Sequence, residues 1–233
     1  MKILIGIPVF RLPASVARCV KAVLDRGADV LIVDNGADYD VKEILRNRMW
    51  DNCQKFTTIS LQTNTYCNGG WNQIMRYGLE HGYDVIALGT SDVFLHDGWQ
   101  HLVGERFRNF QNEVILPRIA QPVEPREFRK AHVVTEGQAG FFTFYPRKAI
   151  EIVYPIPSEI RHWFGDQYIF EKLRALGWQT VVLDDMTCDH EWSSVTAVTP
   201  EAYSVIGQDQ VAWKLLQEKA NGQGTSGGSV STP

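Results

Sequence analysis

The strongest constraint on the fold of this 233-residue chain is a series of short apolar runs that end in small polar residues. The run at residues 30–34 leads into Asp-Asn-Gly, and the run at residues 86–92 ends in Thr-Ser-Asp. Between such runs lie segments whose apolar residues recur at helical spacing, as Val16, Val20 and Val23 do. Because buried strands that alternate with amphipathic helices form parallel sheets, the pattern predicts an α/β fold with a mostly parallel sheet and helices on both faces.

The rest of the chain continues this pattern with less regularity. The predicted strands are residues 3–10, 30–34, 56–61, 86–92, 113–117, 139–145 and 179–183. The predicted helices begin at Pro13, Asp38 or Asp40, Trp71, Asp97, Pro146, Asp166 and Pro200, and those from Trp71 and Pro200 end at His81 and Lys219. We expect residues 118–137, which are rich in charge, to form a loop over the functional site.

Length and composition predict a single domain. With 44% hydrophobic residues the chain can bury one sizeable core, which we assign to residues 1–220. Gly, Ser and Thr dominate residues 221–233, so this tail is predicted to be disordered. A net charge of −4 argues against a protein that binds nucleic-acid backbones, because such binding requires a concentrated basic surface.

Cysteine usage and hydropathy predict a cytoplasmic protein. The four cysteines form no CxxC pair, so neither a zinc site nor a disulfide framework is indicated. The apolar N-terminus is interrupted at Pro8, before it reaches the length of a signal peptide's apolar region. No segment approaches the roughly 18 apolar residues that a membrane-spanning helix requires.

Functional side chains are expected where the strands end, because ligands of open α/β sheets bind beyond the carboxyl ends of the strands. Four stretches end or follow the predicted strands there: residues 8–10, 34–36, 90–92 and 189–190. Their convergence on one edge of the sheet predicts a site centred on Asp92.

These stretches, together with the segment Asn64-Thr-Tyr-Cys-Asn-Gly-Gly-Trp-Asn72, occur in an order that resembles the family 2 glycosyltransferases of the A fold. The resemblance covers residues 2–196. In that family the first strand ends in Pro-x-aromatic, the second ends in Val-Asp, and an Asn- and Gly-rich segment precedes an Asp-x-Asp-like motif. The resemblance implies a single-domain, Rossmann-like glycosyltransferase fold and transfer of a sugar from a nucleoside diphosphate donor, with UDP as the expected nucleotide.

The resemblance also implies a set of donor-binding residues. They are Pro8, Val9, Phe10, Asp34, Asn64, Gly70, Asn72 and Ser91. Asp34 would accept hydrogen bonds from uracil or ribose, and its alternative role is to start the Asp-Asn-Gly turn. Thr65 stands where the family usually has glycine, which is a departure from the pattern.

Asp92 and His190 are the implied protein ligands of Mn²⁺ or Mg²⁺. Thr90 replaces the first carboxylate of the Asp-x-Asp-like motif, so Asp92 would bind the ion together with the donor diphosphate and water. The imidazole of His190 suits Mn²⁺ better than Mg²⁺. Two alternatives are that His190 is a buried structural histidine and that Asp189 supplies the functional carboxylate.

The segment His162-Trp-Phe-Gly-Asp166-Gln resembles the part of these enzymes that carries the catalytic base. Asp166 would take the proton of the acceptor hydroxyl as the oxygen attacks the anomeric carbon, and the family implies inversion at that carbon. The same residue is also a suitable N-cap for the following helix. Gly140 and Trp163 are the expected acceptor-binding residues.

Several alternatives remain open. A nucleotidyltransferase shares this type of sheet, although residues 10–13 lack the glycine series that would bind a triphosphate. A non-catalytic nucleotide-sugar-binding protein fits the missing carboxylate at Thr90. Compact bacterial and phage relatives imply either a glycan precursor or a modified DNA base as the acceptor. The basic cluster at residues 126–132 offers a contact for the donor diphosphate or for an anionic acceptor, and its alternative role is a solvated face of the loop.

Overall fold

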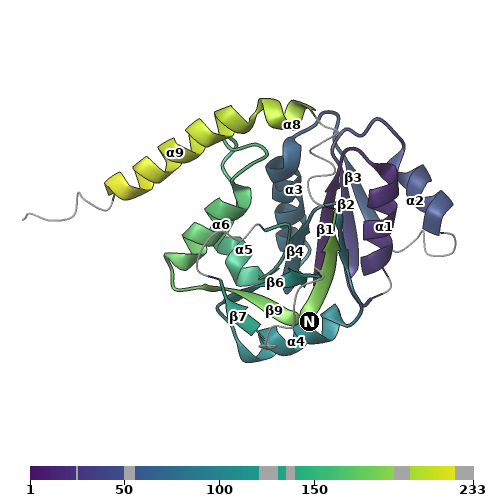
Figure 1. Ribbon diagram of the computed structural model, residues 1–233, viewed down its shortest axis with the longest axis horizontal. Coiled ribbons are helices and arrows are strands. Elements are labelled where there is room, and N and C mark those ends of the chain that lie inside the picture. Colours follow the sequence, from purple (N-terminus) through teal and green to yellow (C-terminus); the bar gives the residue numbers. More distant parts are fainter. Residues whose placement is uncertain (25, 50–55, 121–130, 135–139, 192–199, 224–233) are drawn as a thin grey trace, which may run out of the picture.

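The computed structural model describes residues 1–24, 26–49, 56–120, 131–134, 140–191 and 200–223. Within them, helices cover both faces of one open sheet (Figure 1). The strands are β1 (Ile3–Val9), β2 (Asp29–Asp34), β3 (Phe56–Ser60), β4 (Val85–Gly89), β5 (Val93–Leu95), β6 (Glu113–Ile119), β7 (Ala131–Val133), β8 (Phe142–Pro146) and β9 (Gln179–His190). The helices are α1 (Pro13–Val23), α2 (Val41–Met49), α3 (Tyr66–Glu80), α4 (Trp99–Asn109), α5 (Arg147–Val153), α6 (Gly165–Arg174), α8 (Pro200–Ser204) and α9 (Ile206–Gln223).

The sheet is open and mixed in strand direction. Its order is β3-β2-β1-β4-β8-β6-β9-β5, and β7 pairs with β9. Strands β1, β2, β3, β4, β6 and β9 run in one direction, whereas β5, β7 and β8 are antiparallel to the strands with which they pair. The predicted α/β class is confirmed. The strands β1, β2, β4 and β9, which lead to the four polar stretches, end at the same edge.

The central strands bury both of their faces. Successive side chains of a strand point to opposite sides, so Ile5 and Ala87 belong to the core beneath α1, α2 and α4. Leu4 and Ile86 belong to the core beneath α3, α5 and α6. Burial on both faces explains why the sequences of β1 and β4 are continuous apolar runs rather than alternating ones.

Helix α3 lies close against β1 because glycine removes the side chain at two contacts. A Cβ at Gly6 would lie 2.1 Å from Cγ2 of Ile74. A Cβ at Gly70 would lie 2.6 Å from Cβ of Pro8. These contacts fix the end of β1 against the first turns of α3.

The helix predicted from Trp71 begins five residues earlier, at Tyr66. The two glycines that follow Asn68 disfavour a helix by intrinsic propensity, which is why the sequence indicated a loop. Tertiary contacts outweigh that preference. The amide of Asn68 donates to the carbonyl oxygens of Ile160 (2.9 Å) and Trp163 (3.1 Å), and this interaction anchors the first turn of the helix.

Strand β9 is longer than predicted and ends at His190 rather than at residue 183. The apolar run stops at Leu183, but the strand continues because its second half pairs with the short strand β5. In that pairing Val93 lies opposite His190 and Phe94 lies opposite Asp189. The Asp189-His190 pair is therefore the end of a strand rather than a loop after it.

The region predicted as a loop at residues 118–137 is partly strand. Residues 118–119 continue β6, and residues 131–133 form β7. Both segments pair with β9, which satisfies backbone groups that a charged loop would expose to water. Most of the basic cluster at residues 126–132 lies outside the described residues.

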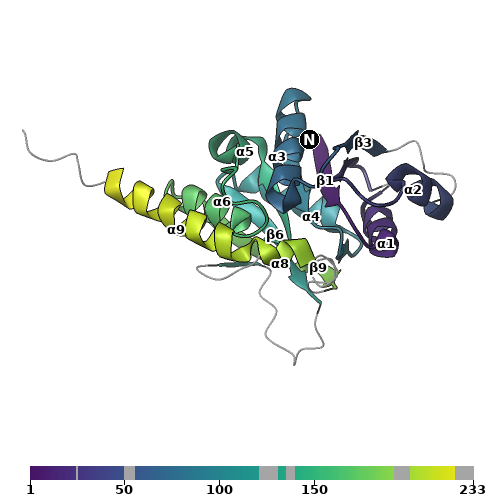
Figure 2. The ribbon, with the colours of Figure 1, turned by 90° about the horizontal axis from the view of Figure 1, so that it is seen from above.

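The helix predicted from Pro200 is divided into α8 and α9. Near the break, the carbonyl oxygen of Ala202 accepts the indole N–H of Trp163 (3.0 Å). Helix α9 runs past α6 and projects beyond the sheet (Figures 1 and 2). It ends at Gln223, so the first three residues of the predicted disordered tail are helical, and residues 224–233 lie outside the described part of the chain.

No helix within the described ranges combines the length and apolar content needed to cross a membrane. Three of the four cysteines lie in those ranges, and Cys19, Cys67 and Cys188 are free thiols.

Candidate active site

A pocket of about 220 Å³ lies at the carboxyl ends of β1 and β4. The predicted site residues that line it are Pro8, Val9, Phe10, Asn64, Ser91, Asp92, Gly140, Trp163 and Asp166. The predicted site residues that do not line it are Asp34, Gly70, Asn72 and His190. The pocket therefore joins the end of the first strand, the end of the fourth and the start of α6, which are far apart in sequence.

Asp92 lines this pocket, and His190 lies beside Asp92 without lining it. Oδ1 of Asp92 is 3.7 Å from Nε2 of His190, and each side chain is less than a tenth exposed. The pair is held together because Val93, at the start of β5, lies opposite His190 in the sheet. The N–H of Glu191 donates to the carbonyl oxygen of Asp92 (2.9 Å), and the ring of Phe141 packs 4.8 Å from the imidazole.

The chemistry of this pair fits a divalent cation. A carboxylate oxygen and an imidazole nitrogen at this separation can bind one ion, and Mn²⁺ accepts both ligand types. The part of the chain that the structure describes contains no group of three or more His, Cys, Asp or Glu side chains able to hold a metal ion. Thr90 has no carboxylate to offer, and its hydroxyl donates to the carbonyl oxygen of Phe141 (3.1 Å). A cation at Asp92 therefore requires further oxygen ligands from a substrate such as a diphosphate.

Asp34 lies at the end of β2, beside the pocket rather than in its lining. Its Oδ1 accepts the N–H of Ala37 (2.9 Å), as a turn-starting aspartate does. The neighbouring Asn35, which the sequence analysis did not single out, lines the pocket. Its Oδ1 accepts the N–H and the hydroxyl of Thr65 (2.8 Å each), and its amide donates to the carbonyl oxygen of Tyr66 (2.8 Å). The threonine that departs from the family pattern thus helps Asn35 to hold the start of α3.

Gly70 and Asn72 act on the site through the elements they hold. Gly70 lies under Pro8, where no side chain fits. Asn72 binds the backbone of Ile156 twice, with its amide donating to the carbonyl oxygen (2.9 Å) and its Oδ1 accepting the N–H (2.8 Å). The first contact positions the end of β1, and the second ties α3 to the segment that leads towards Asp166.

Asp166 lies in the first turn of α6, whose N-cap is Phe164, so the alternative that Asp166 is the N-cap is wrong. Backbone groups hold its carboxylate. Oδ2 accepts the N–H of Gly140 (2.8 Å), and Oδ1 accepts the N–H of Gln167 (2.9 Å). Burial raises the pKa of Asp166 above the usual range of an aspartate, and the two N–H groups oppose that rise. A Cβ at Gly140 would lie 2.7 Å from Cβ of Asp166. Gly140 therefore determines where the carboxylate can lie.

The segment before Asp166 supplies aromatic walls to the pocket, namely His162, Trp163 and Phe164. Burial lowers the pKa of His162, which favours the neutral form of its imidazole. Of the three, only Trp163 was predicted from the sequence, and proximity to Asp166 was the only available signal for His162 and Phe164. Ala202 also lines the pocket, and no sequence signal indicated that α8 reaches it.

Backbone strain gathers at the same place. Among the described residues, the non-glycine residues with a left-handed backbone are Leu12 (φ 57°), Tyr66 (φ 60°) and Phe164 (φ 64°). Tyr66 and Phe164 line the pocket, and Leu12 follows the end of β1. Such conformations cost on the order of 1–3 kcal/mol each and persist where the surrounding structure imposes them, often at functional sites.

Solved structures that share this fold are glycosyltransferases. GalNAc-T7 with UDP, GalNAc and Mn²⁺ has a TM-score of 0.63 and 12% identity over 81% of this chain and 43% of its own. Residues 1–349 of TarS from S. aureus in complex with UDP have a TM-score of 0.62 and 13% identity over 80% of this chain and 60% of theirs. The mannosyltransferase PcManGT from Pyrobaculum calidifontis, with GDP-Man and Mn²⁺, has a TM-score of 0.58 and 10% identity over 81% of this chain and 56% of its own.

These similarities define the fold as that of the GT-A glycosyltransferases. The chain spans about half the length of the structures it matches. Its sequence matches the model of glycosyl transferase family 2 over residues 4–174, and the chain belongs to this family. No curated protein matches the chain. The resemblance inferred from the motifs is thereby confirmed, whereas α8 and α9 lie beyond the matched residues.

Proposed function

We propose that this chain transfers a glycosyl group from a UDP-sugar to an acceptor hydroxyl, with inversion at the anomeric carbon. The observation that best supports this function is that Asp92 and Asp166 line one pocket at the carboxyl ends of the strands. Membership of family 2 supports glycosyl transfer. Similar folds solved with UDP or GDP-Man support a nucleotide sugar as the donor.

The donor would bind along the ends of β1, β2 and β4. Residues 8–10 and Asn64 line the side of the pocket towards β2, and Asp34 lies beside them. A carboxylate there can accept hydrogen bonds from the uracil imide or the ribose hydroxyls. Ser91 and Asp92 would then face the diphosphate.

Asp92 and His190 would hold a Mn²⁺ or Mg²⁺ ion together with the donor diphosphate. When bound, the cation supplies Lewis-acid stabilisation of the departing nucleoside diphosphate. The pairing of β5 with β9 keeps the carboxylate and the imidazole together before substrate binds, so this part of the site is preorganised.

Asp166 would act as the general base. The acceptor oxygen forms a bond to the anomeric carbon, the bond from that carbon to the diphosphate oxygen breaks, and the hydroxyl proton passes to the carboxylate of Asp166. The raised pKa of Asp166 makes it a stronger base than an exposed aspartate. Trp163 and Gly140 lie beside it, where a sugar ring of the acceptor would pack on the aromatic face.

A donor screen tests this function. The native protein is mixed with UDP-, GDP-, dTDP- and CDP-sugars, with and without Mn²⁺, and its melting temperature and the release of nucleoside diphosphate are measured. We expect UDP-sugars with Mn²⁺ to give the largest increase in melting temperature and slow donor hydrolysis, because a ligand that binds only the native state stabilises it.

The same screen separates the alternative functions. Stabilisation without any turnover, even with acceptors present, indicates a non-catalytic nucleotide-sugar-binding protein. Release of pyrophosphate from a nucleoside triphosphate indicates a nucleotidyltransferase. Failure of every nucleotide sugar to raise the melting temperature contradicts the proposal. Acceptors are then compared by incubating labelled donor with glycan precursors and with DNA that carries hydroxymethylated bases.

A further inference from the structure

The segment from residue 160 to residue 164 lies between α3 and α9, and its backbone is bound from both sides. On the α3 side, Asn68 donates its side-chain amide to the carbonyl oxygens of Ile160 (2.9 Å) and Trp163 (3.1 Å). The backbone N–H of Asn68 donates to the carbonyl oxygen of Arg161 (3.0 Å). Helix α3 therefore donates hydrogen bonds to the carbonyl groups of residues 160, 161 and 163.

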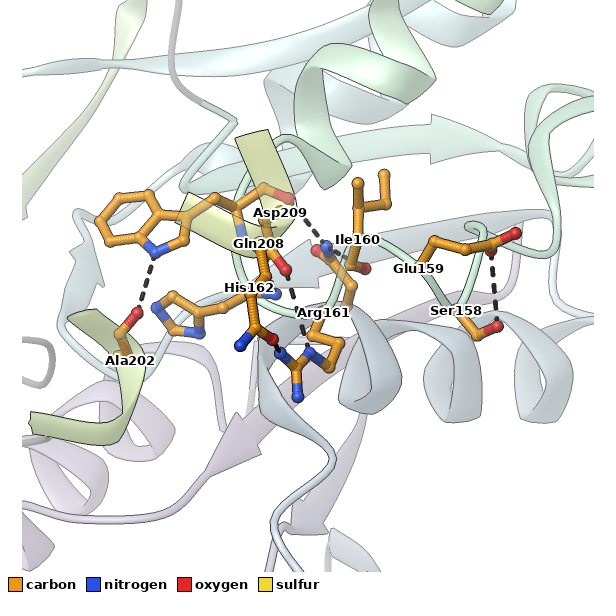
Figure 3. Close-up of polar contacts among 10 residues, drawn as sticks. Ser158, Glu159, Ile160, Arg161, His162, Ala202, Gln208 and Asp209 are labelled. Carbon is orange, nitrogen blue, oxygen red and sulfur yellow. Dashed lines mark hydrogen bonds and ion pairs between the residues drawn. The ribbon is translucent and has the colours of Figure 1, made fainter. Parts of the chain in front are cut away.

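On the other side of the segment, the carboxylate of Asp209 in α9 accepts hydrogen bonds from backbone N–H groups (Figure 3). A single oxygen, Oδ2, accepts the N–H of His162 (2.7 Å) and the N–H of Trp163 (2.9 Å). The other oxygen, Oδ1, is 4.0 Å from Nε of Arg161. Asp209 is 0% exposed. A carboxylate is costly to bury unless hydrogen bonds compensate, so these contacts are what hold it in the interior.

Two further contacts join the C-terminal helices to the same segment. The indole N–H of Trp163 donates to the carbonyl oxygen of Ala202 in α8. The ring of Trp213 in α9 stacks on Phe164 with 6.1 Å between centroids and 9° between planes. Phe164 is the residue with a left-handed backbone that immediately precedes α6, so the helices hold the strained residue as well.

What these contacts fix is the start of α6 and therefore the place of Asp166. Gly165 leaves no space for adjustment on the α3 side, because a Cβ there would lie 2.0 Å from Oδ1 of Asn68. With the backbone of residues 162 and 163 held by Asp209, the carboxylate of Asp166 is kept in reach of the N–H of Gly140.

We propose that Asp209 is a positioning residue of the active site, which sets the place of Asp166 through the backbone of residues 162 and 163. This inference rests on the proposed function, in which Asp166 is the base. It makes α8 and α9, which lie outside the residues that match the family model, a part of the catalytic unit. Asp209 itself touches no reacting atom and does not line the pocket.

The test compares three variants of the whole chain. Asp209→Ala removes both hydrogen bonds to the backbone. Asp209→Asn keeps them, because one oxygen accepts both N–H groups and an asparagine has such an oxygen. Glu113→Ala is the matched control: it breaks a buried pair with Arg106 (2.6 and 2.7 Å) at the opposite end of the sheet, where β6 begins.

For Asp209→Ala we expect the kcat of sugar transfer to fall about 10- to 100-fold, the range that small displacements of a catalytic group can produce. The dissociation constant for UDP with Mn²⁺ should stay within about threefold of the native value, since Asp92 is held by other strands. Asp209→Asn should restore most of the kcat. Glu113→Ala should lower the melting temperature and leave kcat unchanged.

Hydrogen exchange gives a readout that does not depend on activity. The amides of Gly140 and Gln167 donate to Asp166, so their exchange should accelerate in Asp209→Ala and stay slow in Asp209→Asn and Glu113→Ala. If Asp209→Ala does not fold, Asp209→Ser, which leaves room for a water molecule, is carried through the same measurements.

The proposal is overturned if Asp209→Ala keeps the native kcat, or if the exchange of Gly140 and Gln167 is unchanged. It is also overturned if Asp209→Asn is as impaired as Asp209→Ala. A native protein that transfers no sugar defeats the proposed function instead, and the exchange data then still decide whether Asp209 holds Asp166 in place.

Discussion

The carboxylate of Asp166 is subject to two opposing effects. Burial disfavours its charged form and raises its pKa, while the N–H groups of Gly140 and Gln167 favour the charged form. A base with a raised pKa suits proton abstraction near neutral pH, because general-base efficiency increases as the pKa approaches the working pH. The same environment costs folding stability, since the unfolded chain solvates this carboxylate better.

Asp166→Asn should separate the two consequences. We expect sugar transfer to fall about 10²- to 10⁴-fold, the usual contribution of a general base. The melting temperature should change far less than the activity. The neutral amide removes the cost of burying a charge, but its NH₂ group cannot accept one of the two backbone N–H groups that the carboxylate accepts. Steady-state kinetics and thermal unfolding measure these quantities. A loss of activity that merely follows unfolding at the assay temperature would indicate that Asp166 only stabilises the first turn of α6.

The pH dependence follows from the direction of the pKa shift. As the pH falls through the raised pKa of Asp166, the base becomes protonated and kcat/KM should decrease. The acid limb should therefore have its midpoint above the ordinary pKa of an aspartate. In the same window this group destabilises the fold less, because protonation relieves the buried charge. An acid limb at or below the ordinary value would contradict the assignment.

Among the elements, α3 is the one that the site depends on most. It holds β1 through Gly70, the end of β2 through Asn35 and the segment before α6 through Asn68. Its glycines allow this because they bring the helix axis closer to the sheet than side chains would permit. A helix with alanines in their place would be intrinsically more stable but would not fit here.

Gly70→Ala tests this element. The added methyl group would lie 2.6 Å from Cβ of Pro8, so we expect a loss of about 1–3 kcal/mol in the free energy of unfolding. Gly207→Ala is the matched control: a Cβ there meets no atom within 4 Å, and the helical position should gain about 0.5–1 kcal/mol. Denaturant unfolding measures both. Equal effects of the two substitutions would contradict the close packing of α3.

For the whole molecule, the pocket depends on how distant parts of the chain meet. The pocket lies at the carboxyl ends of β1 and β4, and the pairing of β5 with β9 places His190 beside Asp92. Hydrogen bonds from α3 and α9 hold the segment before α6. Donor and cation would bridge several of these parts, so their binding should stabilise the fold as a unit.

Removal of the cation tests this coupling. At a UDP concentration 100 times the dissociation constant, UDP with Mn²⁺ should stabilise the native protein by about 2.7 kcal/mol, and a chelator should abolish most of that gain. Asp92→Asn should lose the Mn²⁺-dependent part, because an amide is a weaker ligand than a carboxylate. Asp166→Asn, the control, should keep it. Stabilisation by UDP that is unaffected by chelator and by Asp92→Asn would contradict a metal site at Asp92.

The sequence by itself determined the class of fold and half of the residues that line the pocket. Apolar runs such as that of β4 are typical of central strands, and those central strands that run parallel end at a common edge. Asp92 could therefore be placed at that edge without coordinates, whereas Asp166 was chosen from the resemblance to the family 2 glycosyltransferases. The backbone preferences of glycine and aspartate also gave the turn at residues 34–36 correctly.

Tertiary contacts decided which elements form where the local sequence disfavours them. The first turns of α3 contain two glycines and form a helix only because Asn68 and the packing on β1 stabilise them. The end of β9 is polar and becomes a strand only by pairing with β5. The role of Asp209 depends on its hydrogen bonds to His162 and Trp163, which lie 47 and 46 positions earlier in the chain. No local pattern encodes such contacts. Local sequence fixes which elements are favourable, whereas burial and long-range hydrogen bonds select among them once the elements meet.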